Sequence, residues 1–281
     1  MLQLRENHML VQPNLMIDAD YGLNKHQTNI VMMGLGLLDT TALHRSKDAI
    51  TFDIEELYQV SKSKLRKDRY IAIIKQSLKE IKNSPLSLVN PITKDFREIP
   101  WLSELSGNLN TNKVTLYFNQ RVLNLFSELK GDYTQCLLRN TMPLQTTYAK
   151  RIYQMVMQYK PPQQIPEIAL GEFRAMLQLA DTYPVYGELN RRVIIPAIKD
   201  INKQTDILLN VKTVKTVKTV NALQFTYKFK SKKQSDVYQT SAKKSFKRKA
   251  KKALRKHKSV DKMSPNELYA HIEKQNNATN S

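Results

Sequence analysis

The chain has 281 residues, enough for two domains of ordinary size that each bury a core. Its hydrophobic fraction of 41% is close to the globular norm, but 45 Lys and Arg against 25 Asp and Glu leave a formal charge of +20, which predicts a polyanionic partner. The single cysteine, Cys136, excludes an internal disulfide, and with no secretory signal and no apolar stretch longer than residues 30–38 we expect a cytoplasmic protein without membrane spans.

The first half of the chain shows helical periodicity before any strand pattern. Helices are expected at residues 24–40, 53–60 and 63–84. Short strands are expected after them, at residues 86–89, 97–105 and 113–118, followed by a helix at 119–129. Three helices followed by a hairpin is the element order of a winged helix.

The second half repeats this order with different residues. Helical stripes lie at residues 148–159, 170–180 and 187–203, and residues 206–230, rich in Val, Thr and aromatics, predict a hairpin. We therefore expect an α+β protein with two tandem winged-helix domains, mainly helical with β-hairpin wings. The expected division is an N-terminal arm at 1–20, a first winged helix at 21–132, a second at 133–230 and a basic tail at 231–281.

The helix expected at residues 187–203 has two different faces. Arg192, Lys199 and Lys203 fall on the side opposite its apolar stripe, with Arg191 at the flank. Such a helix can enter a DNA major groove, where Arg pairs with guanine in a bidentate way, although an ordinary solvated face would show the same pattern. Pro196 removes one helical hydrogen bond and should bend this helix.

The expected hairpin contains the triplet Lys-Thr-Val three times, beginning at Lys212, Lys215 and Lys218. Because strand side chains alternate with period two, a regular strand would send these lysines to alternating faces, so we expect a turn or bulge to interrupt it, with the tip near Thr216. The lysines would then face the phosphate backbone as a wing. The alternative is a relic of repeat slippage on a solvated loop.

A second basic cluster lies where the third helix is expected to begin. It comprises Lys62, Lys64, Arg66, Lys67 and Arg69. A helix N-terminus disfavours cations, so a phosphate partner would relieve the repulsion. A merely solvated charged face is the alternative.

Most of the positive charge lies near the C-terminus. Residues 228–262 carry 15 Lys and Arg against 2 Asp. We expect the tail to be mostly disordered, because like charges repel and there is little apolar area to offset ordering. It should add nonspecific DNA affinity; an anionic membrane surface or RNA is the alternative partner.

Signatures of catalysis are absent from the sequence. There is no glycine-rich phosphate loop, and the five histidines never fall two or four residues apart, which excludes the usual His-pair metal motifs. We expect no enzymatic activity, no cofactor and no metal.

Four segments carry a family resemblance. They are Tyr148-Ala149-x-Arg151-x-Tyr153, Tyr186-x-x-Leu189-x-Arg191-Arg192-Val193, Pro196-Ala197-Ile198-Lys199-Asp200-Ile201-Asn202 and Leu223-x-Phe225. With these segments the chain resembles the theta-type plasmid replication initiators, the RepB-like family that includes relatives of the F-plasmid initiator. The resemblance covers about residues 20–230. Many relatives have a Gly-Arg wing tip that is missing here.

The resemblance implies a function in the bacterial cytoplasm. Members have two winged helices, bind repeated origin sequences called iterons as monomers, and in many cases repress their own promoter as dimers. It implies that Asn190, Arg191 and Arg192 read bases, and that the first domain adds dimer contacts and further DNA contacts. We therefore expect a plasmid replication initiator that binds double-stranded origin DNA, helps to open it, recruits host helicase and host initiator protein, and exchanges between homodimer and monomer.

Two other hypotheses stay open on the sequence. A winged-helix transcription regulator would bind a lone palindrome rather than direct repeats. A rolling-circle relaxase would need a nicking tyrosine and a metal-binding histidine pair; the 13 tyrosines supply the first and nothing supplies the second.

Overall fold

The structure of the chain, a computed structural model, describes most of the first 231 residues. The described ranges are 8–19, 21–38, 49–89, 95–108, 110–127, 133–159, 163–179 and 181–231. Residues 1–231 group into one unit by their contacts. The disorder expected for the basic tail concerns residues 232–281, which lie outside the described residues.

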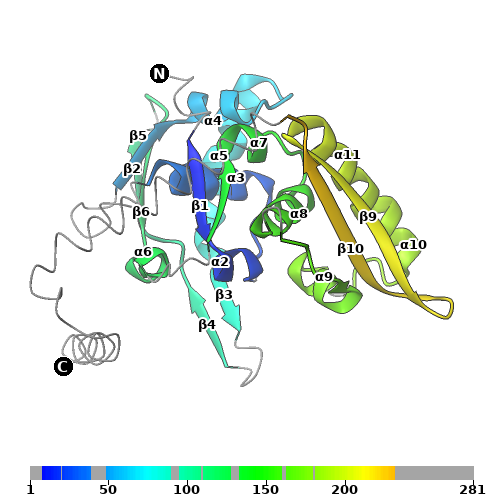
Figure 1. Ribbon diagram of the computed structural model, residues 1–281. Coiled ribbons are helices and arrows are strands. Elements are labelled where there is room, and N and C mark those ends of the chain that lie inside the picture. The colour runs from blue at the N-terminus through cyan, green and yellow to red at the C-terminus, as the bar shows by residue number, and fades with distance from the viewer. Residues whose placement is uncertain are drawn as a thin grey trace, which may run out of the picture. The chain divides into compact units, whose positions relative to one another are not determined.

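Three helices and a three-stranded sheet build the first winged helix (Figure 1). The helices are α3 (Lys25–Leu37), α4 (Ile54–Val60) and α5 (Lys67–Glu80), and the antiparallel sheet has the order β2 (Ala49–Asp53), β6 (Lys113–Phe118), β5 (Leu102–Asn108). The expected cap of α3 is confirmed, because the Asn24 side chain accepts the N–H groups of His26 and Gln27 at 2.9 and 3.0 Å. The expectation that no strand precedes residue 86 is wrong, since β2 is a five-residue strand whose periodicity is too short to recognise.

A further hairpin and helix follow α5. Strands β3 (Leu86–Val89) and β4 (Phe96–Ile99) pair with each other, and α6 (Gln120–Ser127) follows β6. The single strand expected at residues 97–105 is wrong, because β4 and β5 are separate strands that belong to separate sheets. Pro100 and the buried Trp101 lie between them, and a proline has no N–H to donate to a ladder.

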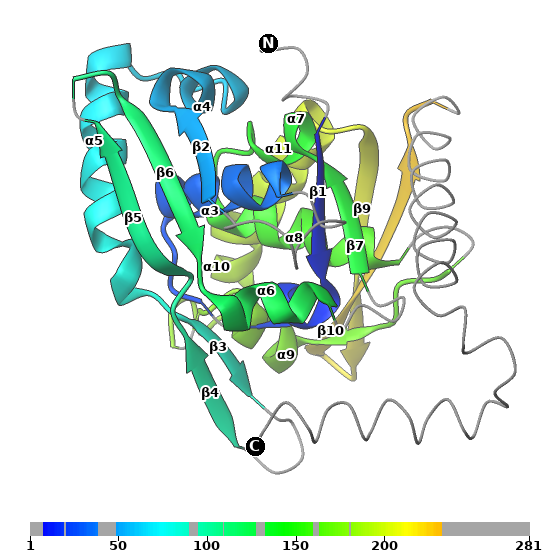
Figure 2. The ribbon, with the colours of Figure 1, turned by 90° about the vertical axis from the view of Figure 1, so that its left-hand side faces the viewer.

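A strand near the N-terminus and a strand that follows α6 form a two-stranded sheet. Strand β1 (Met9–Pro13) pairs antiparallel with β7 (Tyr133–Leu137), from Met9 opposite Leu137 to Pro13 opposite Tyr133 (Figure 2). Short helices α2 (Asn14–Asp18) and α7 (Leu138–Thr141) continue these strands. The pairing differs from the expected organisation, because it joins residues assigned to an N-terminal arm to residues assigned to the second winged helix, and Leu10 and Met16 of that arm are buried.

Helix α3 lies at the centre of the first core and is buried nearly all round. Its two glycines permit this position. A Cβ placed on Gly34 would lie 2.8 Å from the ring of Phe118, and one on Gly36 would lie 2.8 Å from a methyl group of Leu138. Both distances are far below contact distance, so the glycines allow strand β6 and helix α7 to approach the helix closely.

The second winged helix is built from later elements. Its helices are α9 (Leu170–Met176) and a long helix in three parts, α10 (Tyr186–Leu189), the π-helical turn η2 (Asn190–Ile194) and α11 (Ile195–Gln204). Helix α8 (Thr147–Gln158), which precedes them, packs against β7 and α2 and also against α11. Strands β8 (Ile168–Ala169), β10 (Thr219–Phe229) and β9 (Ile207–Thr216) form a sheet in the order β8-β10-β9. The rings of Phe173 and Phe225, 5.7 Å apart, lie in its core. Across the described residues, no helix is both long and apolar enough to cross a membrane.

Candidate nucleic-acid interface

The helix of residues 186–204 changes its hydrogen-bond pattern in the middle. Pro196 has no N–H to donate to the carbonyl of Arg192, four residues earlier. The N–H of Ile195 donates instead to the carbonyl of Asn190, five residues earlier, and this closes the π-turn η2. The flanking residues Leu189 and Ile195 keep helical backbone angles, so the chain accommodates Pro196 with a π-turn and the helix continues.

The two expected faces of this helix are confirmed. Its apolar side chains Leu189, Val193, Ile194, Ala197 and Ile201 are at most 2% exposed. We call the opposite side the reading face and define it by its exposed residues, which are Arg191, Arg192, Ile195, Pro196, Lys199 and Lys203. Asn190, the remaining base-reading candidate, is half-buried and supplies the carbonyl that closes the π-turn.

Side chains fix this helix to the hairpin that follows it. The Asn202 side chain donates to the carbonyl of Leu209 at 2.9 Å and accepts the Leu209 N–H at 2.6 Å. The Lys230 ammonium donates to the carbonyls of Asn202 and Thr205 at 2.7 and 2.6 Å. The negative end of the helix dipole also stabilises a cation at this position. The reading face is therefore held in a fixed relation to strands β9 and β10.

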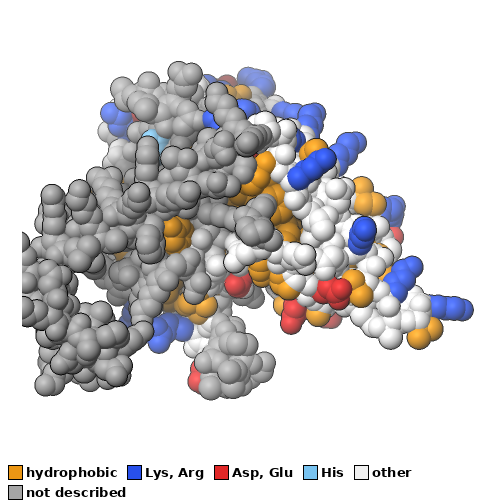
Figure 3. Space-filling view, viewed as in Figure 1, with side chains coloured by type: hydrophobic (Ala, Val, Ile, Leu, Met, Phe, Trp, Pro, Cys, Tyr) orange, Lys and Arg blue, Asp and Glu red, His pale blue; other side chains and the backbone are white. Residues whose placement is uncertain are grey.

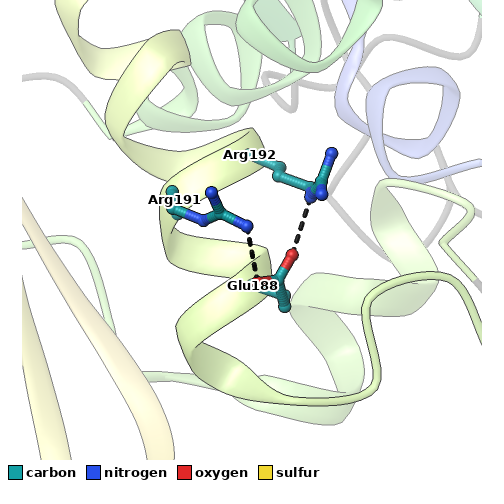
Figure 4. A network of polar contacts seen from close by, with 3 residues as sticks. All are labelled: Glu188, Arg191 and Arg192. Carbon is teal, nitrogen blue, oxygen red and sulfur yellow. Dashed lines mark hydrogen bonds and ion pairs between the residues drawn. The ribbon is translucent and has the colours of Figure 1, made fainter.

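Glu188, which the sequence pattern does not single out, holds both candidate base-reading arginines. Its Oε1 lies 2.7 Å from Nη2 of Arg191, and its Oε2 lies 2.7 Å from Nε of Arg192 (Figure 4). Hydrogen bonds from Arg192 and Arg191 lower the pKa of the Glu188 carboxyl. The bond between Arg192 and Glu188 also raises the pKa of Arg192. Because all three side chains are exposed, water screens these ion pairs, so their main effect is on orientation rather than stability.

The loop before the helix supplies a second neighbour for Arg192. Arg174 donates to the carbonyls of Tyr183 and Thr182 at 2.7 and 2.8 Å, and Tyr183 has a left-handed φ of 56°. The guanidinium of Arg192 lies 5.9 Å from the centre of the Tyr183 ring, within cation–π range. The position of this loop thus also restricts the orientation of Arg192.

The wing is the hairpin of β9 and β10, and its tip lies where the sequence predicts it. Thr216 pairs with Thr219, and Val217 and Lys218 form the turn, so the expected interruption lies between Lys215 and Lys218. A register shift in β10 follows between Val220 and Ala222, after the three lysines. Lys212, Lys215 and Lys218 are all exposed; the first two point to opposite faces of β9. Figure 3 shows Lys and Arg side chains along the right-hand edge of the molecule, over the region of α11, α10 and this hairpin.

The basic cluster near the start of α5 is exposed, but α5 begins later than expected. Helix α5 starts at Lys67 rather than near Ser63, because Lys62 adopts a left-handed φ of 47° and the chain makes a loop first. Lys62, Lys64 and Arg66 therefore lie in that loop, whereas Lys67 and Arg69 lie in the first turn. Two members have acidic neighbours, with Lys67 at 2.7 Å from Glu55 and Arg66 at 3.6 Å from Asp68.

The first segment that carries the family resemblance is buried and structural. Lys150 donates to the carbonyls of Thr141 and Met142 at 2.7 and 2.9 Å, and its burial lowers its pKa well below the usual value. Arg151 donates to the carbonyl of Ala19 at 2.7 Å, and the hydroxyl of Tyr153 contacts Asp206 at 3.1 Å. These side chains are buried and hold α8 in place.

No metal centre is found in the part of the chain that the structure describes, where His, Cys, Asp and Glu side chains do not gather in groups of three or more.

Comparisons with known proteins agree with this architecture. Residues 9–157 match the family described as "Initiator Replication protein, WH1", and residues 169–227 match "Initiator Rep protein, WH2". These two matches confirm the two winged-helix domains that the sequence predicts.

Individual relatives are distant. An Escherichia coli protein named "Replication initiation protein" is 23% identical over 209 residues, which are 72% of this chain and 65% of that protein, so the match spans slightly less than two thirds of the relative. The solved structure "Crystal structure of Pi initiator protein in complex with iteron DNA" covers 81% of this chain and 99% of its own, with 16% identity and a TM-score of 0.67. At that identity the likeness shows the fold.

Proposed function

The chain belongs to the family of initiator replication proteins, and we propose on this basis that it starts plasmid replication by binding iterons in double-stranded origin DNA and helping to open the DNA beside them. The Pi initiator, whose fold it shares, was solved in complex with iteron DNA. The structure of this chain supports the same kind of binding through a surface described by its own residues.

One observation carries the proposal. The helix of residues 186–204 buries every apolar side chain of one face and presents Arg191, Arg192 and Lys199 on the other. A helix with this division of faces fits a major groove, where arginine can donate two hydrogen bonds to O6 and N7 of guanine. We propose that Arg191 and Arg192 read bases, with Asn190 beside them.

The remaining basic residues have a different proposed part. Exposed lysines on a strand or loop contact phosphates, which fixes register and orientation but carries no sequence information. We assign phosphate contacts to Lys199, Lys203, the three wing lysines and the basic cluster near the start of α5, which comprises Lys62, Lys64, Arg66, Lys67 and Arg69.

We also propose a revised boundary between the two winged helices. The division expected at residue 132 separates β1 from its partner β7, and it separates Leu138 and Met142 from the core of α3 to which they belong. A boundary between residues 157 and 169 keeps these contacts within one domain and coincides with the gap between the two family matches.

Partners beyond DNA follow from family membership. We propose that host helicase and host initiator protein are recruited to the opened origin, and that the protein exchanges between a homodimer that represses its own promoter and a monomer that initiates. Sedimentation of the protein with and without origin duplex tests the exchange, and a constant dimer mass on DNA would contradict it.

The experiment for the central proposal compares two substitutions on sequences that the full chain selects from a random duplex pool. Arg191→Ala should cost about 1–3 kcal/mol on the selected sequence and relax its base preference. Lys215→Ala should weaken binding to all sequences alike and reduce the slope of log affinity against log salt by about one unit. Failure of the wild-type chain to select any sequence would rule out the initiator proposal.

A further inference from the structure

The centre of the reading face is apolar. Ile195 is 55% exposed, and it lies four and three residues after Arg191 and Arg192 and four residues before Lys199. Residues at these spacings are neighbours on one helix face. The isoleucine therefore lies between the basic residues that the proposed function places in the groove.

The register of the helix exposes this side chain. Leu189, Val193, Ile194 and Ile201 are at most 1% exposed and Ile198 is half-buried, whereas Ile195 is exposed. At about 100° per residue, Val193 and Ile194 both fall on the buried side with Leu189 and Ile201, and Ile195 falls on the opposite side. Isolated surface isoleucines are common in proteins, but Ile195 differs because it lies beside Arg191 and Arg192.

We propose that Ile195 forms a subsite for the 5-methyl group of a thymine in the major groove. This inference rests on the proposed function, in which the reading face enters that groove. The thymine methyl is the apolar group that the major-groove edge of DNA presents, and contact with it removes apolar surface of both partners from water. A charged group such as a phosphate gains no comparable stabilisation from contact with an isoleucine.

The spacing within the helix places this thymine relative to the guanine contacts. One helical turn advances about 5.4 Å along the helix axis, whereas successive bases of a strand are about 3.4 Å apart along the duplex. Ile195 lies one turn from Arg191 and Arg192. The thymine should therefore lie within about two base pairs of the position at which Arg191 or Arg192 contacts guanine.

Replacement of thymine by deoxyuridine tests the subsite directly, because deoxyuridine removes the methyl group and keeps the base pair. The probe is the duplex that the full chain selects from a random pool, with each thymine replaced in turn at fixed salt. For the wild-type chain one replacement should lower affinity by about fourfold, as expected for the burial of one methyl-sized group. Ile195→Ala should bind the thymine and deoxyuridine duplexes equally at that position.

Two controls make the result specific. Leu15→Ala removes a similarly exposed aliphatic side chain, 54% exposed on α2, and should keep the full deoxyuridine penalty. Thermal unfolding should show that Ile195→Ala is as stable as the wild type, since an exposed side chain contributes little burial.

The outcomes separate this inference from the proposed function. A wild-type chain that selects a sequence but tolerates every deoxyuridine overturns the subsite, as does an Ile195→Ala variant that keeps the penalty. A wild-type chain that selects no sequence overturns the proposed function itself.

Discussion

At the scale of single residues, Glu188 orients the two arginines that we propose as base readers. Each of its carboxylate oxygens accepts a hydrogen bond from one guanidinium at 2.7 Å, so Arg191 and Arg192 are held before DNA arrives. Orienting a side chain in advance reduces the entropy that binding must cost, whereas a negative charge on the reading face repels phosphates. Glu188 should therefore reduce affinity for all DNA and increase discrimination.

Glu188→Gln tests this balance. The neutral amide no longer repels DNA and cannot accept both guanidinium groups as a carboxylate does, so affinity for nonspecific duplex should rise while the ratio of specific to nonspecific affinity falls several-fold. Competition binding at several salt concentrations measures both quantities. Glu172→Gln, which removes the charge of another exposed acid on α9, should leave the ratio unchanged. If Glu188→Gln also left the ratio of specific to nonspecific affinity unchanged, the ion pairs of Glu188 would have no part in specificity.

The sequence predicts exposed basic side chains well and their fixed geometry poorly. Arg192, Lys199 and the wing lysines are exposed as the helix wheel and the strand period require, because periodicity reports which face is apolar. Glu188 is missed because one Glu three and four residues before two arginines is indistinguishable from an ordinary helical ion pair. That spacing, read together with the base-reading candidates, is the signal that could have identified it.

At the scale of elements, several helices and some short strands follow from the sequence, since β3 and β6 have the expected bounds. Helices α3, α4 and α8 begin at or within a residue of the expected positions. Strands β1, β2 and β7 have five residues each, and their pairing depends on partners 60 or more residues away, which local periodicity cannot report. The π-turn is missed for a similar reason, since Pro196 predicts a lost hydrogen bond but not the five-residue bond that compensates for it.

The two glycines of α3 give an element-scale prediction. Gly34→Ala should lower the free energy of unfolding by about 1–3 kcal/mol, because its Cβ would overlap the ring of Phe118 in the packed core. Gly171→Ala on α9 is the matched control, since no atom lies within 4 Å of its added Cβ and alanine favours the helix by roughly 0.5–1 kcal/mol. Urea unfolding measures both, and equal effects of the two substitutions would contradict close packing at Gly34.

At the scale of the whole molecule, we expect affinity and specificity to come from different parts of the chain. Residues 232–281 carry 14 Lys and Arg against 4 Asp and Glu, a concentration of charge that can neutralise phosphates of any sequence. The reading face carries four cationic side chains, of which the two arginines can each donate two hydrogen bonds to a guanine. The formal charge of +20 thus indicates a nucleic-acid partner without indicating where sequence is read.

Removal of residues 232–281 separates these contributions. Residues 1–231 form their own contact unit, so the shortened chain should fold and keep the specificity ratio of the full chain. Its affinity for every duplex should fall, and the salt dependence of binding should become shallower. A loss of discrimination together with the tail would show that the tail takes part in base recognition.

The central claim is that the reading face recognises repeated sequences at an origin. Its most direct test is a footprint of the full chain on the plasmid DNA that flanks its gene, combined with interference by guanine N7 methylation. We predict protection of directly repeated sites of about 20 base pairs, two helical turns for two winged helices, with guanine contacts that disappear in Arg191→Ala. Uniform protection without sequence preference, a lone palindrome, or guanine contacts unchanged in Arg191→Ala would contradict it.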